Sequence, residues 1–168
     1  FFGGASDEGA IAVVVEATGE VIVGGLGSGS LPMTLGAFQT SFKPPGEAWV
    51  LRLDASGSLR VFSTWLGGAG LEEITRIALD GSGAAVIAGR AGRADFPVTP
   101  GALDATFGGA TEGFLLELDA QGAALGWAAV NSSWGDRQGM SKIAMGFVSI
   151  LIGLMAVSIV NLAISWVS

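Results

Sequence analysis

The feature that most limits the fold of this 168-residue chain is a segment that the sequence contains twice. Position 2 aligns with position 66, an offset of 64, and the inserted Asp95 then raises the offset to 65. The segments 13–25 and 77–89, for example, read VVVEATGEVIVGG and IALDGSGAAVIAG. A repeat of this kind is one supersecondary unit that packs against its neighbours. The alignment therefore predicts two structural units with the same fold.

Each unit contains four short apolar runs that predict β-strands, because they are rich in Val, Ile, Leu and aromatic residues and are bounded by Gly, Asp and Ser. The outer pairs are joined by the turn sequences EATGE, DASGS, DGSGA and DAQGA. In such turns Gly supplies a positive φ and the acidic side chain accepts backbone hydrogen bonds. We expect strands at 10–15, 20–25, 48–53 and 59–65 in the first unit, and at 74–79, 84–89, 113–118 and 124–130 in the second.

A long loop joins the second and third strands of each unit, over residues 26–46 and 90–111. The two loops carry Pro, Thr, Gly, Ala and Phe at matching places, and we expect Phe96 and Phe107 to hold the ends of the second loop by packing. The strand AIAVVV at 10–15 is apolar on both faces, which predicts burial between two neighbouring sheets. We also expect five large aromatic residues to pack between the units: Trp49, Phe62, Trp65, Phe114 and Trp127.

Four-stranded units at a fixed period are typical of the blades of a β-propeller. Three motifs carry a closer resemblance to a known family: Trp65-Leu66-Gly67-Gly68, the run FPVTPGA that begins at Phe96, and the run EAWVLRLD that begins at Glu47. Through these motifs, residues 1–130 resemble the bacterial β-propeller repeats often called SBBP. The resemblance implies an exported structural or binding module of the bacterial envelope, and it transfers no catalytic residues.

The chain departs from the pattern of that family at three places. It contains no Tyr, so the Tyr that the family carries in one strand is absent. Glu117 stands where the family has a basic residue, and Lys43-Pro44-Pro45 replaces a Gly-rich turn.

The segment from 143 to 168 differs from the rest of the chain because it contains no charged residue. As a helix, 26 residues would extend for about 39 Å. That length crosses a hydrocarbon core of about 30 Å with some tilt. The sequence therefore predicts one transmembrane helix at 143–168, and a buried helix of a soluble protein is the alternative.

Small residues at spacings of three and four predict a packing face on this helix. They are Gly146, Ser149, Gly153 and Ala156, and such residues let two membrane helices approach closely. The alternative is that small residues are simply common in membrane helices. Asn161 is a polar group within the span, and it either bonds to a partner helix or lies near an interface.

Two arguments about the membrane side disagree. Arg137 and Lys142 precede the span, so the positive-inside rule places the repeat units in the cytoplasm. The resemblance to exported proteins places them outside it, and we expect a single-pass protein with a periplasmic or extracellular β-repeat domain. The expected partners are the lipid bilayer and other membrane subunits, whereas a net charge of −7 argues against nucleic acid.

The chain is thus predicted to contain two β-repeats at 1–65 and 66–130, a linker at 131–142 and the helix at 143–168. Because propellers typically have about 4–8 blades, two repeats predict further partners. Residues 130–136 resemble the beginning of a third unit. Three interpretations are open: a piece of a longer protein, sheets completed by partner subunits, or a last strand followed by a linker. The opening FFGG indicates a processed product or fragment, and the sequence GMSK before the span leaves a fusion or composite chain open.

The chain contains neither His nor Cys, so it cannot supply a Ser–His triad, a thiol nucleophile or a thiolate metal site. Paired carboxylates occur at Asp7-Glu8 and Glu72-Glu73, at equivalent places in the two units. Acid–base catalysis needs such groups to converge in a pocket. We favour instead a solvated turn before a strand, and we expect no cofactor.

Two of the turns superficially resemble calcium loops, because Asp54 and Asp80 are followed closely by Ser and Gly. They lack the further oxygen ligands that calcium requires. We expect an Asx turn at each, and one calcium ion in an inter-blade loop is the alternative.

Together these observations predict a non-enzymatic, membrane-anchored accessory or scaffold subunit, whose extracytoplasmic β-repeat module is docked on a larger membrane assembly. The alternative is a fragment of a cell-surface β-propeller that binds glycans or proteins through its loops. An enzyme would need a mechanism that uses carboxylates alone.

Overall fold

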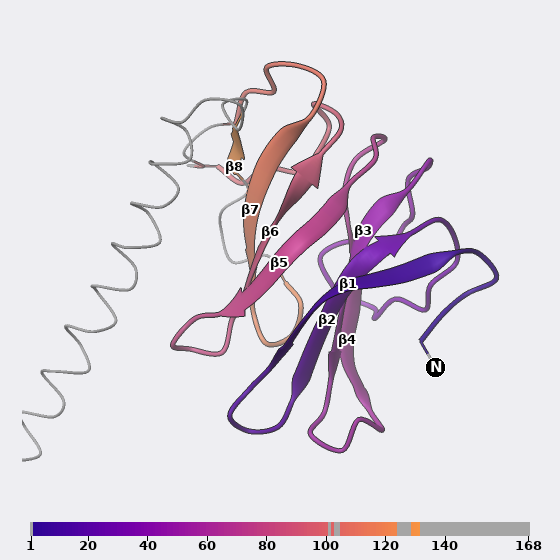
Figure 1. Ribbon diagram of the computed structural model, residues 1–168, viewed down its shortest axis with the longest axis vertical. Helices are drawn as coiled ribbons and strands as arrows, with labels where there is room; N and C mark the ends of the chain where they lie inside the picture. The colour runs from indigo at the N-terminus through magenta and orange to yellow at the C-terminus, as the bar shows by residue number, and fades with distance from the viewer. Residues whose placement is uncertain (1, 101, 103–104, 124–128, 132–168) are drawn as a thin grey trace, which may run out of the picture. The chain divides into compact units, whose positions relative to one another are not determined.

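The structure is a computed structural model, and it describes residues 2–100, 102, 105–123 and 129–131. The chain divides into two compact parts, Phe1–Ser132 and Ser133–Ser168, and all described residues belong to the first part. The first part consists of two antiparallel β-sheets, one from each repeat unit (Figure 1). The prediction of a mainly β fold built from two antiparallel sheets is confirmed.

Each sheet is a meander in which strands that follow one another in the sequence are neighbours. The first sheet contains β1 (Glu8–Val15), β2 (Val21–Gly27), β3 (Glu47–Leu53) and β4 (Arg60–Leu66). The second contains β5 (Glu73–Leu79), β6 (Ala85–Ala91), β7 (Glu112–Leu118) and the short β8 (Ala129–Asn131). The first seven strands begin and end within two residues of the predicted bounds. The eighth is described only at its end, since residues 124–128 lie outside the described residues.

The hairpin turns have the predicted chemistry. Asp80 Oδ1 accepts the N–H of Ser82, two residues on, at 2.8 Å, so the Asx turn is confirmed at Asp80. Asp54 Oδ1 instead accepts the N–H groups of Ser58 and Leu59, four and five residues on, at 2.9 and 2.8 Å. The described residues contain no group of three or more acidic, His or Cys side chains that suits a metal ion. Positive φ occurs at the turn glycines Gly19, Gly57, Gly83 and Gly122.

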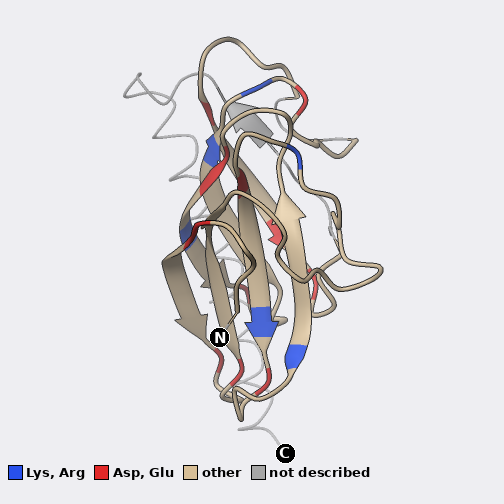
Figure 2. Ribbon diagram, turned by 90° about the vertical axis from the view of Figure 1, so that its right-hand side faces the viewer, with Lys and Arg blue, Asp and Glu red and all other residues tan. Residues whose placement is uncertain are grey.

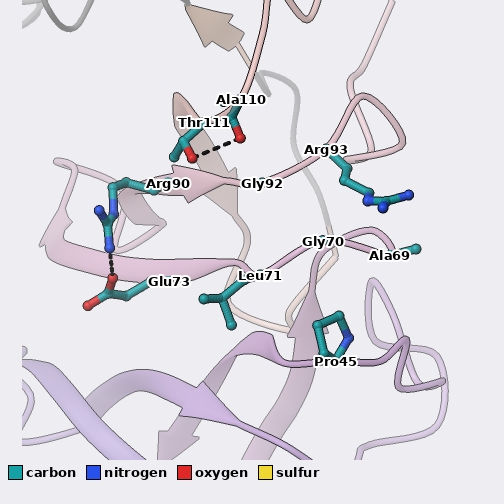
Figure 3. Close-up of a pocket in the computed structure, with 10 residues that line it drawn as sticks. All are labelled: Pro45, Ala69, Gly70, Leu71, Glu73, Arg90, Gly92, Arg93, Ala110 and Thr111. Carbon is teal, nitrogen blue, oxygen red and sulfur yellow. Dashed lines mark hydrogen bonds and ion pairs between the residues drawn. The ribbon is translucent and has the colours of Figure 1, made fainter.

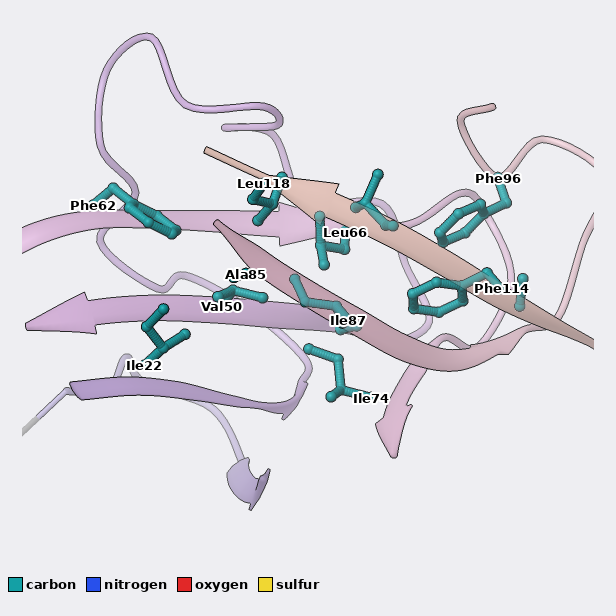
Figure 4. Close-up of a cluster of buried hydrophobic side chains, with 13 residues drawn as sticks. Ile22, Val50, Phe62, Leu66, Ile74, Ala85, Ile87, Phe96, Phe114 and Leu118 are labelled. Carbon is teal, nitrogen blue, oxygen red and sulfur yellow. The ribbon is translucent and has the colours of Figure 1, made fainter. Parts of the chain in front are cut away.

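The core lies between the two sheets (Figure 4). Ile22, Val50, Phe62 and Leu66 of the first sheet are buried in one cluster with residues of the second sheet. The second sheet contributes Ile74, Ala85, Ile87, Phe114, Leu116 and Leu118. The sheets approach closely at Gly24, where a Cβ atom would lie 2.7 Å from Cδ1 of Ile77. We call the face of the first sheet that packs here its inner face.

The long loops pack on the sheets, as expected, but the aromatic residues divide between two clusters. Phe96 stacks on Phe114 with ring centroids 4.5 Å apart, and Phe107 packs against the same core. Trp49 and Trp65 do not pack between the sheets, which corrects the prediction for these two residues. They lie on the opposite face of the first sheet from Phe62, in a cluster that Leu31 and Phe42 of the first loop complete. Trp127 lies outside the described residues.

The prediction that the first strand is buried on both faces is wrong. Ala12 and Val14 of β1 pack against the core, whereas Val13 and Val15 are exposed. Side chains alternate along a strand, so these two pairs lie on opposite faces. In the described part of the chain, the second sheet covers only one of those faces.

A buried arginine links the two sheets at one end of the core. Arg52 donates to Glu16 Oε1 at 2.5 Å and to Glu20 Oε2 at 2.6 Å within the first sheet. Its Nη1 also donates to the carbonyl of Gly83, in the β5–β6 turn of the second sheet, at 3.2 Å. Most of the charged residues lie toward the ends of the strands (Figure 2). The side chain of Arg52 is buried there, whereas Glu16 and Glu20 are partly buried.

We predict that Arg52→Ala lowers the free energy of unfolding by about 3–5 kcal/mol, because it leaves the Glu16 carboxylate buried without its partner. The matched control is Arg90→Ala, which removes a more exposed ion pair with Glu73 and should cost less than about 1 kcal/mol. Denaturant unfolding followed by tryptophan fluorescence measures both. Equal losses in the two variants would show that Arg52 does not link the sheets.

Candidate functional site

The first sheet exposes an apolar surface on the side away from the core, and we call it the open face. Its central row is in register, because Val23 of β2 pairs with Val13 on one side and with Leu51 on the other. Val13 is 64% exposed and Val15 is 61% exposed. The open face is formed by Val13, Val15, Val21, Val23, Leu51 and Leu53.

The repeat shows what kind of surface this is. The alignment that relates the two units carries the six residues of the open face onto six apolar residues of the second sheet: Ile77, Leu79, Ala85, Ile87, Leu116 and Leu118. Four of these are fully or almost fully buried, and the other two pack against the same core. They are the residues that meet the inner face of the first sheet.

The same pattern of side chains is therefore covered in one unit and largely uncovered in the other. Val21 and Val23 are only partly buried, whereas the equivalent Ala85 and Ile87 are fully buried. The difference does not arise from chemistry, since all positions are apolar. It arises because the inner face of the first sheet covers these residues of the second sheet. No described residue forms a sheet that covers the open face of the first sheet in the same way.

Part of the open face is nevertheless shielded by the chain itself. Leu51 is buried in the cluster of Trp49 and Trp65, and Phe2 packs on Trp49 with ring centroids 5.4 Å apart. The uncovered part is therefore centred on β1 and β2. Contiguous exposed apolar surface of this kind often marks a protein interaction site.

A second group of interest is a pair of buried carboxylates where the two units join. The N–H of Glu72 donates to the carbonyl of Gly46 at 3.2 Å, which connects the end of the first long loop to the start of the second unit. A Cβ atom on Gly67 would lie 2.5 Å from Glu72 Oε2 and 3.1 Å from Glu47 Oε1. Both carboxylates thus approach the Gly67 position, which only glycine can occupy without displacing them.

Each carboxylate organises the loop beside it. Glu47 accepts hydrogen bonds from Gln39 Nε2 at 2.5 Å and from the N–H of Lys43 at 2.6 Å. Glu72 accepts longer hydrogen bonds from the N–H groups of Gly68 and Gly92, at 3.3 and 3.4 Å.

Burial raises the pKa of both carboxyl groups. For Glu72, burial is the largest cause and raises the pKa to about 7, against the hydrogen bonds from Gly92 and Gly68. The negative charges of Glu47 and Asp95 raise it further. The pKa of Glu47 is raised mainly by burial as well, against its hydrogen bonds with Lys43 and Gln39.

The prediction of solvated turns is therefore wrong for Glu72, which is fully buried. It holds for Asp7, which is exposed, while Glu8 and Glu73 are partly buried. The sequence contained a usable signal, since the repeat places Glu8 on Glu72 and Glu47 on Glu112. Neither Glu47 nor Glu72 is among the residues that line the pocket of Figure 3. The hydrogen bonds of Glu47 and Glu72 hold the loops where the two repeats join.

A polar pocket of about 390 Å³ lies beside this joint (Figure 3). Arg90 and Glu73 form an ion pair on one side of it, and Leu71 and Pro45 give it an apolar wall. Arg93 lies at the other side and forms no ion pair within the described part of the chain. The pocket therefore offers hydrogen-bond donors of the kind that bind hydroxyl or carboxylate groups.

The predicted membrane segment lies outside the described residues. This applies to the packing stripe of Gly146, Ser149, Gly153 and Ala156 and to Asn161. Among the residues that the structure describes, no helix has the length and apolar character needed to cross a membrane.

Comparison of the sequence with protein-family models and with curated proteins gives no match. The open face, the carboxylate pair and the pocket are therefore interpreted from their own geometry.

We predict that the stability of the protein falls as the pH rises from 5 to 8. The pKa of Glu72 is raised from 4.5 to about 7 on folding, so its contribution is fully present below pH 4.5 and is lost as the pH rises through 7. The loss amounts to about 3 kcal/mol. Glu72→Gln should remove most of this dependence, as measured by denaturant unfolding at several pH values.

The matched control is Glu73→Gln, which changes the neighbouring and more exposed carboxylate. It should keep the pH dependence of the unsubstituted protein. If Glu72→Gln keeps the same pH dependence as this control, the carboxylate is not titrating in the way that its burial implies.

Proposed function

We propose that this chain is a non-enzymatic accessory or scaffold subunit, anchored in a membrane by residues 143–168 and docked on a larger assembly through its β-repeat domain. The observation that carries the proposal is the open face of the first sheet. On this face Val13 and Val15 are 64% and 61% exposed beside the partly buried Val21 and Val23, and contiguous apolar surface of this kind often marks a protein interaction site.

The size of the expected gain supports a docking role. Full burial of one valine side chain contributes about 1.5–3 kcal/mol relative to leaving it exposed. Because Val13 and Val15 are 64% and 61% exposed, a partner that covered both would gain about 2–4 kcal/mol from them, before the costs of association.

The resemblance of the repeats to SBBP propeller units supports an exported module that packs against further sheets. The uncharged segment 143–168 and its stripe of small residues support a helix that packs within a membrane assembly. The absence of His and Cys from the chain supports a role that does not involve catalysis.

The proposal predicts that the chain sediments with membranes and, after gentle solubilisation, elutes in a particle much larger than one chain and its detergent. Val13→Lys/Val15→Lys should release it from that particle, because two charges then face the partner. The matched control is Leu35→Lys, at a loop position that is 97% exposed. Native mass measurement of the solubilised material distinguishes the outcomes. A folded, monodisperse monomer obtained from membranes that contain the unsubstituted chain would refute the proposal.

A second candidate function is a surface module that binds glycans or proteins through its loops, and the pocket beside Arg90 and Arg93 supports it. A glycan array tests this function directly. Specific binding that Arg93→Ala abolishes would favour it, and the absence of any bound glycan would count against glycan recognition.

A further inference from the structure

The interface between the two sheets identifies what would cover the open face. The open-face residues and the buried residues of the second sheet occupy the same repeat positions, and the buried set meets the inner face of the first sheet. The open face therefore has the residue pattern of a surface that packs against an inner face. The central residues of the inner face in this chain are Ile22, Val50 and Phe62.

The same interface also contains a polar contact to the Gly83 carbonyl, and the first sheet has an equivalent carbonyl in its own β1–β2 turn. Arg52 of the inner face donates to the carbonyl of Gly83 in the turn of the sheet that it meets. The alignment places Gly19 on Gly83, and both have a positive φ, 93° and 84°. Among the described residues, nothing donates a hydrogen bond to the carbonyl of Gly19. A sheet that covered the open face would reach this carbonyl with the residue at the position of Arg52.

The second sheet of another copy of this chain is a poor occupant for that place. Its far face keeps apolar residues at the centre, since Val86 and Leu115 align with Ile22 and Val50. Glu117, however, stands at the position of Arg52, and a carboxylate cannot donate to a carbonyl when it is ionised. Arg76 stands at the position of Ala12, where it would bring an unpaired charge against apolar side chains. These two residues disfavour head-to-tail association of identical copies, which would otherwise produce open fibres.

We propose, as a specific form of the scaffold function above, that the open face binds a further four-stranded repeat unit that is neither of the two that the structure describes. This unit presents an apolar sheet face like that of Ile22, Val50 and Phe62, and it carries a basic residue at the position of Arg52. That residue donates to the carbonyl of Gly19. Interactions of both kinds are already present between the two sheets of this chain.

The test uses a variant of the full chain as a stand-in for the partner. This probe carries Arg76→Ala and Glu117→Arg, which give its far face the residue types of Ala12 and Arg52, and Val13→Lys/Val15→Lys, which closes its own open face. Asp80, the equivalent of Glu16, is then available to pair with the new cation as Glu16 pairs with Arg52. The labelled probe is mixed with the unsubstituted chain in detergent and followed by sedimentation velocity.

We expect a 1:1 complex between the probe and the unsubstituted chain. Binding should weaken at least tenfold when the unsubstituted chain is replaced by its Val13→Lys/Val15→Lys form, and it should be unchanged with Leu35→Lys. A probe that retains Arg76 and Glu117 should also bind at least tenfold more weakly. Circular dichroism confirms that each variant is folded.

Three results would overturn the inference. They are the absence of any complex, binding that does not depend on Val13 and Val15, and binding that is as tight when Glu117 and Arg76 are retained. The last result would identify a second copy of this chain as the occupant. Because these experiments use purified chains, their result does not depend on the membrane. The probe can bind even if the chain belongs to no membrane assembly, and it can fail to bind even if the chain does belong to one. The inference and the proposed function are thus tested separately.

Discussion

The packing of one apolar sheet face on another is the interaction on which this structure depends. Ile22, Val50 and Phe62 are buried only because a second sheet lies over them, and Ile87 is buried only because the first sheet lies over it. Each sheet has two faces, however, and a pair of sheets buries one face of each. Among the described residues, Val13 and Val15 on the other face of the first sheet are therefore left exposed.

The polar groups define how the two units are joined. Arg52 connects the first sheet to a turn of the second at one place, and Glu47 and Glu72 organise the loops at the joint between the units. Buried charges are costly unless they are paired or hydrogen-bonded, so such groups favour one arrangement of the sheets over others. The cost is visible at Glu72, where burial raises the pKa to about 7. The stability of the joint between the two repeats is therefore expected to depend on pH.

The repeat in the sequence was sufficient to predict the two meanders, the bounds of the first seven strands within two residues and the Asx turn at Asp80. These features depend on local sequence, namely alternation, turn residues and the repeat itself. The exposure of Val13 and the position of Trp49 could not be predicted in the same way, because they depend on which face of a sheet has a neighbour. The burial of Glu72 is a similar case, since it depends on contacts between units. A strand that is apolar on both faces shows that both faces suit burial, but it does not show that both are buried.

The central claim is that Val13 and Val15 of the open face are uncovered in the isolated chain, and the absence of cysteine allows a direct test. Single-cysteine variants at Val13, at Ile87 and at the loop residue Leu35 are labelled with a thiol reagent in the purified, folded protein. The account predicts that Val13→Cys reacts about as fast as Leu35→Cys and that Ile87→Cys reacts at least a hundredfold more slowly. Protection of Val13→Cys equal to that of Ile87→Cys would mean that the chain covers this face itself, and it would contradict the account.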